Sequence, residues 1–131
     1  MEVEPGISFL LDPRDLVSSA LLSTKQWQPE IWNAISPALN EGSVFLDVGA
    51  HIGYFSMKAS RKAGRTGRVL AFEPNPETLV LLRDNVRVNR AWPGETLTRY
   101  LRRTPRIARS APRFTTKVMR NSSVPVRKST R

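Results

Sequence analysis

The fold of this 131-residue chain is decided by the stretch VFLDVGAHIG at residues 44–53. Its first five residues are apolar except for Asp47 and rich in β-branched and aromatic side chains, which is typical of a strand buried on both faces of a sheet. Gly49 ends this run. Residues 52–63 then have the apolar spacing of a helix. The stretch therefore predicts a buried strand that turns directly into a helix.

A second strand and a second helix follow immediately. The sequence RVLAFE at residues 68–73 is a strand candidate that ends against Pro74. Pro76 stands where the first turn of a helix tolerates proline, and apolar residues then recur at helical spacing. The order strand, helix, strand, helix over residues 43–89 predicts an α/β half-domain with a parallel sheet and right-handed crossovers.

The preceding residues, 1–42, predict a helical lead-in. Asp12 or Asp15 is a candidate N-cap for a first short helix. Pro29 begins a second stretch in which apolar residues recur at three and four, and Pro37 should kink or interrupt that helix.

The last part of the chain, residues 90–131, differs from the rest. Arg, Pro, Ser and Thr dominate it, and neither the helical nor the strand period persists. This composition is typical of a disordered, basic tail. A complete doubly wound sheet needs more chain than the preceding residues supply. We therefore expect a partial sheet, in which the strand at residues 44–48 keeps an exposed apolar edge.

The net charge of +10 is confined to that tail. Residues 1–89 carry nine basic and ten acidic side chains, a net charge of −1, whereas residues 90–131 carry twelve basic side chains and one acid, a net charge of +11. A basic tail of this kind is the electrostatic footprint of a nucleic-acid partner. The tail has few aromatic residues on which bases could stack, so we favour a solvated tail over a binding module.

Composition limits the remaining classes. The chain has no cysteine and a single histidine, His51, so neither a disulfide nor a metal site is expected. No apolar run approaches the roughly 18 residues that span a membrane. The first residues are acidic rather than basic and apolar, which argues against a secretory signal. We expect a soluble, cytoplasmic protein of unknown oligomeric state.

The turn after the first strand has the features of a nucleoside site. Gly49 lets the chain turn sharply and lets a ligand approach the backbone, while the next helix points its free N–H groups toward that ligand. Glu73 ends the second strand twenty residues beyond Gly53, where a carboxylate can accept both ribose hydroxyls. The spacing Asp-x-Gly-x-x-x-Gly differs from that of dinucleotide enzymes. The pattern indicates an adenosine-type cofactor, the alternative being glycines that serve packing alone.

Both motifs resemble those of FkbM-type methyltransferases. The stretch VFLDVGAHIGYF at residues 44–55 is similar to the first cofactor motif of that family, and GRVLAFEPNP at residues 67–76 is similar to its second motif. The lead-in residues DPRDL at 12–16 and the region 27–29 resemble the family too. The similarity covers about residues 10–89, the N-terminal half of such an enzyme.

The resemblance implies a partial Rossmann-like methyltransferase sheet with S-adenosylmethionine as its cofactor. Asp47 and Gly49 would line the methionine end of the cofactor, and Gly53 would support the turn. Glu73 would hold the ribose hydroxyls, and Asn75 would lie near the adenine. His51 stands where the family more often has asparagine, so we interpret it as a polar loop residue beside the cofactor rather than as a catalytic or metal-binding residue.

The resemblance favours methyl transfer to an oxygen of a small molecule or sugar, which is an in-line displacement. No residue is assigned as the general base. Members of the family continue with further strands and helices that complete the adenine pocket and the acceptor site. Nothing after Arg90 has that pattern, so we expect a truncated or frame-shifted methyltransferase that is inactive alone.

Two alternatives from other classes stay open. A nicotinamide-dependent oxidoreductase fragment would also place a carboxylate at Glu73, although the glycine fingerprint of such enzymes is incomplete here. A nucleic-acid-binding protein would act through the basic tail, and its affinity would fall steeply with salt.

Overall fold

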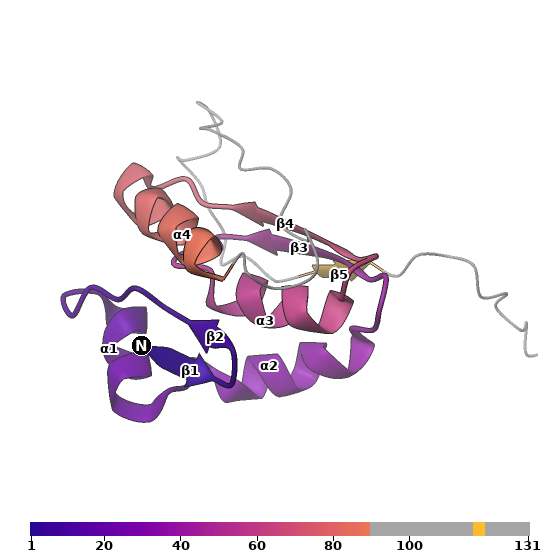
Figure 1. Cartoon of the computed structure of the whole chain (residues 1–131), viewed down its shortest axis with the longest axis horizontal. Coiled ribbons are helices and arrows are strands. Elements are labelled where there is room, and N and C mark those ends of the chain that lie inside the picture. Colours follow the sequence, from indigo (N-terminus) through magenta and orange to yellow (C-terminus); the bar gives the residue numbers. More distant parts are fainter. Residues whose placement is uncertain (90–116, 120–131) are drawn as a thin grey trace, which may run out of the picture.

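The computed structural model describes residues 1–89 and 117–119 (Figure 1). Along the chain its elements are β1 (Glu2–Glu4), β2 (Ile7–Ser8), α1 (Leu16–Thr24), α2 (Pro29–Ile35), a 3-10 helix η1 (Ser36–Ala38), β3 (Val44–Val48), α3 (Tyr54–Ala63), β4 (Arg68–Phe72), α4 (Pro76–Val88) and β5 (Lys117–Met119).

The sheet that carries the motifs has the strand order β4-β3-β5. Strands β3 and β4 are parallel and in register from Val44 opposite Arg68 to Val48 opposite Phe72, and α3 connects them across one face (Figure 1). The predicted order strand, helix, strand, helix is confirmed. Because parallel strands end at the same edge of a sheet, the residues that follow β3 and β4 meet there.

Local sequence explains where the two helices begin. Gly53, with φ +91°, stands before the first turn of α3, so this helix begins two residues later than the apolar pattern predicts. Asn75 is the N-cap of α4, and its side chain accepts a hydrogen bond from the backbone N–H of Glu77. Pro76 then occupies the first helical position, where its missing N–H costs nothing.

One face of the sheet is fully covered. Phe45 and Val69 are completely buried there and pack with Ala59 of α3 and with Leu39. On the other face, Val44, Leu46, Val48, Leu70 and Phe72 are only half-buried. The apolar run of β3 predicted burial on both faces, but α3 covers only one of them.

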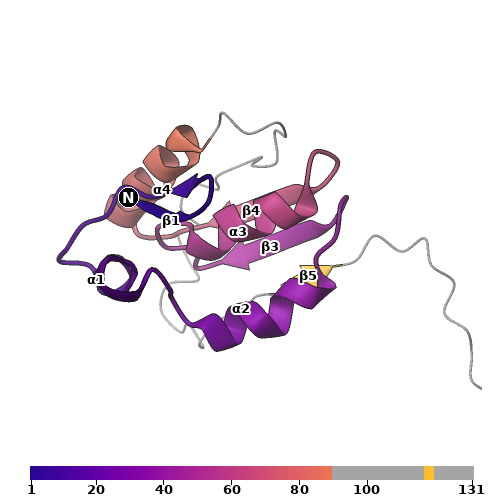
Figure 2. The same ribbon diagram turned by 60° about the horizontal axis from the view of Figure 1, so that its bottom comes forward.

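The lead-in belongs to the same core as the α/β half-domain. Buried apolar side chains of the lead-in pack with those that follow β3, with one side chain of β4 and with the inner face of α4; they are Val3, Ile7, Phe9, Val17, Leu21, Ala50, Ile52, Tyr54, Met57, Ala71, Leu79, Leu82 and Val86. Figure 2 shows the lead-in hairpin beside α4, and α1 on the same side of the molecule, at the end of the sheet where β3 and β4 finish. The lead-in therefore lies against the edge that holds the two motifs.

The lead-in contains more than the two predicted helices. The antiparallel pair β1–β2 was not predicted, because its strands are only three and two residues long and a Pro5-Gly6 turn joins them. The predicted interruption at Pro37 is confirmed, since α2 ends at Ile35 and a 3-10 turn follows.

The expectation of an exposed edge at β3 is wrong. Strand β5 pairs antiparallel with β3, with Val44 opposite Met119, Phe45 opposite Val118 and Leu46 opposite Lys117. The pairing occurs because an open edge presents unpaired N–H and C=O groups that a further strand satisfies. Apart from β5, the predicted disordered tail lies outside the described residues.

Candidate functional site

The glycine turn, residues 49–53, is fastened to the end of β4 by backbone hydrogen bonds. The N–H groups of Gly49 and Ala50 both donate to the carbonyl of Phe72, at 2.8 and 3.0 Å. Gly49 has φ +85°, and a Cβ built on it would meet nothing within 4 Å. The space in front of Gly49 is therefore open, and a ligand can approach the backbone closely.

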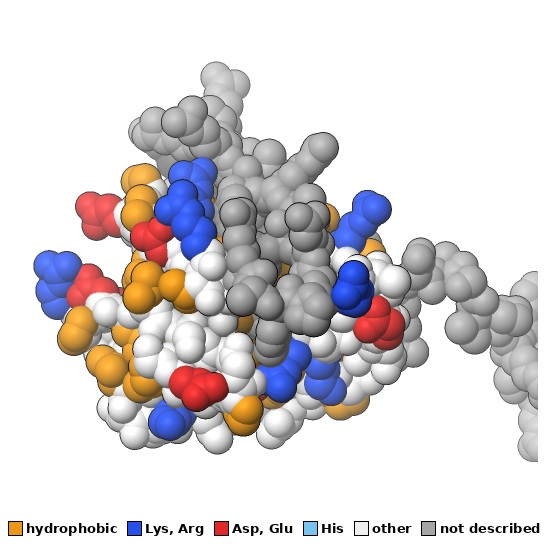
Figure 3. Space-filling view, in the orientation of Figure 1, with side chains coloured by type: hydrophobic (Ala, Val, Ile, Leu, Met, Phe, Trp, Pro, Cys, Tyr) orange, Lys and Arg blue, Asp and Glu red, His pale blue; other side chains and the backbone are white. Residues whose placement is uncertain are grey.

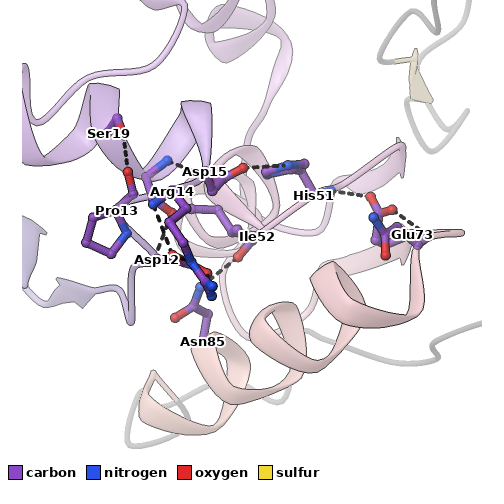
Figure 4. A network of polar contacts seen from close by, with 11 residues as sticks. Asp12, Pro13, Arg14, Asp15, Ser19, His51, Ile52, Glu73 and Asn85 are labelled. Atoms are coloured by element: carbon purple, nitrogen blue, oxygen red, sulfur yellow. Dashed lines mark hydrogen bonds and ion pairs between the residues drawn. The ribbon is translucent and has the colours of Figure 1, made fainter.

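Glu73 reaches the same turn from the end of β4. Its Oε2 accepts a hydrogen bond from the backbone N–H of His51 and its Oε1 accepts one from the N–H of Asn75, each at 2.8 Å. The side chain is buried, but each carboxylate oxygen retains a second lone pair. The structure thus brings together the glycine turn and the predicted ribose acceptor, which lie next to each other in Figure 4.

Asp47 is hydrogen-bonded to the helix that follows the turn, and its predicted contact with the cofactor stays a prediction. It is 3 % exposed and its Oδ2 accepts a hydrogen bond of 2.6 Å from the hydroxyl of Ser56 on α3. Burial raises the pKa of this carboxyl group, and the Ser56 hydrogen bond acts in the opposite direction. In the structure, Asp47 fastens α3 to β3 underneath the turn.

Gly53 and Asn75 have local structural partners. A Cβ on Gly53 would lie 2.5 Å from Cδ1 of Leu82, so only glycine fits between the turn and α4. The side chain of Asn75 is exposed and caps α4. The predicted contacts of these two residues with a cofactor stay predictions.

His51 connects the turn to the lead-in. Its backbone is left-handed, with φ +54°, and its Nε2 lies 3.1 Å from Oδ1 of Asp15. Asp15 is also the N-cap of α1, where its Oδ2 accepts the N–H of Ser18. The predicted cap at Asp15 is confirmed, but nothing in the local pattern indicated that the same carboxylate contacts His51.

A second connection was missed as well. Asn85 on α4 is completely buried and bridges Leu10 of the lead-in and Ile52 of the turn. An amide on the inner face of a helix, between Leu82 and Val86, was the signal that could have found it, because buried amides are normally hydrogen-bonded.

The described residues contain no group of three His, Asp or Glu side chains that could hold a metal ion. In the same part of the chain, no helix is both long enough and apolar enough to cross a membrane. On the face shown in Figure 3, basic and acidic side chains are interspersed rather than gathered in one basic patch. The basic residues that suggested nucleic-acid binding lie mostly outside the described residues.

Comparison with protein families decides the class. The profile of the TRM5/TYW2 methyltransferase domain matches residues 1–99, about three quarters of the chain. The chain belongs to this family. The predicted methyltransferase domain is thereby confirmed, and S-adenosylmethionine is the cofactor that this assignment implies. The FkbM assignment is not confirmed. No curated protein sequence matches the chain.

Solved structures confirm the Rossmann-like fold of methyltransferases. The present chain is similar to a protein-L-isoaspartate O-methyltransferase, with 22 % sequence identity and a TM-score of 0.51. The similarity covers 59 % of the present chain and 24 % of the solved chain. A precorrin-6y C5,15-methyltransferase from Geobacter metallireducens matches 76 % of this chain and 46 % of its own, with 23 % identity and a TM-score of 0.54. The chain therefore spans less than half the length of each of these solved methyltransferases.

The residues present fit an adenosine-type cofactor. Open space at Gly49 allows contact with the backbone, and the remaining lone pairs of Glu73 are acceptors for ribose hydroxyls. The N-terminus of α3 lies at the same edge, and the carboxylate of Asp47 binds Ser56 in its first turn.

Proposed function

We propose that this chain is the cofactor-binding part of an S-adenosylmethionine-dependent methyltransferase. The observation that carries the proposal is the adjacency of Gly49 and Glu73, one offering open space at the backbone and the other a carboxylate with free lone pairs. The match to the TRM5/TYW2 methyltransferase domain supports it. A cytoplasmic location stays a prediction.

In this proposal, Gly49 lies against the methionine end of the cofactor and Glu73 accepts the ribose hydroxyls. Asp47 lines the methionine end together with Gly49, Gly53 supports the turn, and Asn75 borders the adenine. The bound cofactor supplies an electrophilic methyl group. The residues of the chain bind it, orient it and keep water from one side of it, which is the main protein contribution to an in-line displacement.

The methyl acceptor is also part of this proposal. Oxygen methylation of a small molecule or sugar rests on the FkbM resemblance alone. The described residues contain no side chain that can be assigned as general base from its contacts. Because the chain spans less than half of the solved methyltransferases that it matches, the acceptor site is expected on parts of the fold beyond the described strands.

Cofactor binding can be measured directly by titrating the purified chain with S-adenosylmethionine and S-adenosylhomocysteine in a calorimeter. We expect Glu73→Gln to weaken binding at least tenfold, because hydrogen bonds to a charged group contribute about 1.5–3 kcal/mol. Gly49→Ala should weaken it as well, since the new methyl group enters the space of the ligand.

Glu41→Gln is the matched control. The carboxylate of Glu41 also accepts a backbone N–H, that of Thr66, but it precedes β3 and lies at the opposite end of that strand. Its substitution should leave the dissociation constant unchanged. Equal losses at Glu41 and Glu73, or tighter binding of NAD than of S-adenosylmethionine, would contradict the proposed function. Micromolar binding by the wild-type chain would contradict the expectation of a truncated, incomplete site.

A further inference from the structure

Two side chains outside the predicted cofactor site connect the lead-in to the glycine turn. They are Asp15, at the start of α1, and Asn85, in the third turn of α4, and Figure 4 shows both facing the turn. Each bridges elements far apart in the sequence.

Asn85 uses both ends of its amide. The side chain is 0 % exposed, its Oδ1 accepts the N–H of Leu10 at 2.6 Å, and its Nδ2 donates to the carbonyl of Ile52 at 2.9 Å. A buried amide that loses its partners has no water to replace them. Asn85 therefore holds the carbonyl of Ile52 at a fixed place relative to the lead-in.

The two carboxylate oxygens of Asp15 have different partners. Oδ2 accepts the N–H of Ser18 at 2.7 Å, which caps α1, and Oδ1 lies 3.1 Å from Nε2 of His51. The other ring nitrogen, Nδ1, is buried and has no hydrogen-bond partner in the described part of the chain. We therefore assign the ring hydrogen to Nε2, where Asp15 accepts it. This contact fixes the orientation of the His51 ring.

The turn needs such support because of its backbone. His51 has φ +54°, a conformation that is unfavourable for a residue with a Cβ and persists only when the surroundings impose it. In this conformation the N–H of His51 points at Oε2 of Glu73. If His51 relaxed to a negative φ, Glu73 would lose that donor and the carboxylate would be free to turn away.

We propose that Leu10 and Asp15 of the lead-in, together with Asn85 of α4, form a clamp that holds the glycine turn in its binding conformation, with Asp15 and Asn85 as positioning residues. The lead-in is then part of the cofactor site although it touches no cofactor. The effect of the clamp on S-adenosylmethionine rests on the proposed function, whereas its effect on the turn does not.

The competing explanation is that these bonds merely attach the lead-in to the rest of the fold. Asn89 provides the comparison, because it lies one helical turn after Asn85 and binds the lead-in equally well. Its Oδ1 accepts the N–H of Ser8 and its Nδ2 donates to the carbonyl of Ser8, at 3.0 and 2.7 Å, and Nδ2 also donates to the backbone carbonyl of Asn85 at 2.6 Å. The contacts of Asn89 do not include the glycine turn.

The test compares Asn85→Ala with Asn89→Ala and Asp15→Ser with Asp12→Ser. Serine is as good an N-cap as aspartate, so Asp15→Ser keeps the start of α1 but is too short to reach His51. Among the residues that the structure describes, the hydrogen bonds of the Asp12 carboxylate all come from Arg14. The primary measurement is amide hydrogen exchange by NMR at His51 and Gly53, relative to the core amide of Val69, in the full chain without ligand.

We expect Asn85→Ala and Asp15→Ser to accelerate exchange at His51 and Gly53 about tenfold over Val69, as the loss of one buried hydrogen bond predicts. Their affinity for S-adenosylhomocysteine should fall by a similar factor. The two control variants should leave both quantities at their wild-type values, even where Asn89→Ala lowers the melting temperature.

Equal acceleration in Asn85→Ala and Asn89→Ala, together with no acceleration in Asp15→Ser, would overturn the clamp. Should Asn85→Ala fail to fold, the comparison of Asp15→Ser with Asp12→Ser decides alone, because both positions are partly exposed. A wild-type chain that binds no S-adenosylhomocysteine at millimolar concentration counts against the proposed function. The exchange data still decide the clamp in that case.

Discussion

Replacing Gly53 by alanine measures how tightly the glycine turn packs against α4. Gly53 has φ +91°, and its added Cβ would lie 2.5 Å from Cδ1 of Leu82, which is completely buried and cannot move without displacing its neighbours. The left-handed backbone costs about 1–2 kcal/mol, and the overpacked methyl group costs about 1–3 kcal/mol more. We expect Gly53→Ala to lower the free energy of unfolding by about 2–5 kcal/mol.

Gly49→Ala separates the two contributions. Gly49 has nearly the same φ, +85°, but its added Cβ would meet nothing within 4 Å. Only the backbone contribution of about 1–2 kcal/mol should appear. Urea unfolding followed by tryptophan fluorescence gives both values. Equal losses of stability in the two variants would refute the reasoning, because the contact with Leu82 would then cost nothing.

A double variant checks the assignment of the clash to Leu82. Leu82→Ala alone should cost about 2–5 kcal/mol through the cavity it leaves. Combined with Gly53→Ala it should cost less than the sum of the two single changes, because the atom that the new Cβ meets is gone. If the two costs simply add, the strain introduced by Gly53→Ala does not come from contact with Leu82.

Three further outcomes follow from the charges of the described residues. Burial raises the pKa of Asp47, so the folded state holds a proton that the unfolded state releases. The free energy of unfolding should therefore fall as pH rises from 3.8 through the raised pKa. Asp47→Asn should remove this fall, which urea unfolding at pH 4 and pH 8 can show. Lys58 is buried beside Glu4 and lies over two aromatic rings. Lys58→Met should therefore lower the free energy of unfolding by about 1–2 kcal/mol. A double-mutant cycle with Glu4→Gln should show that the two side chains stabilise each other. The Arg14 guanidinium lowers the pKa of Asp12 to about 2, and in Arg14→Ala an NMR titration should show this pKa returning toward 3.8. The melting temperature should not change, because ion pairs at the surface contribute little to stability.

The sequence predicted those elements whose cause is local. The apolar run before Gly49, the proline at the first position of α4 and the interruption at Pro37 each act within a few residues, and each appears in the structure where it was predicted. The adjacency of Gly49 and Glu73 also followed from the sequence, because two parallel strands joined by one helix must end at the same edge.

The sequence alone thus determined the class of fold, the pair of motifs and the edge of the sheet at which they meet. Only the tertiary structure decided how the turn is held. The contact between Leu10 and Asn85 spans 75 residues, and the contact between Asp15 and His51 joins a helix cap to a loop. Neither leaves a periodic pattern, because a hydrogen bond between distant side chains depends on packing that short-range propensities do not specify. The same holds for Asp47, whose carboxylate points under the turn toward Ser56 because α3 packs on that face of the sheet.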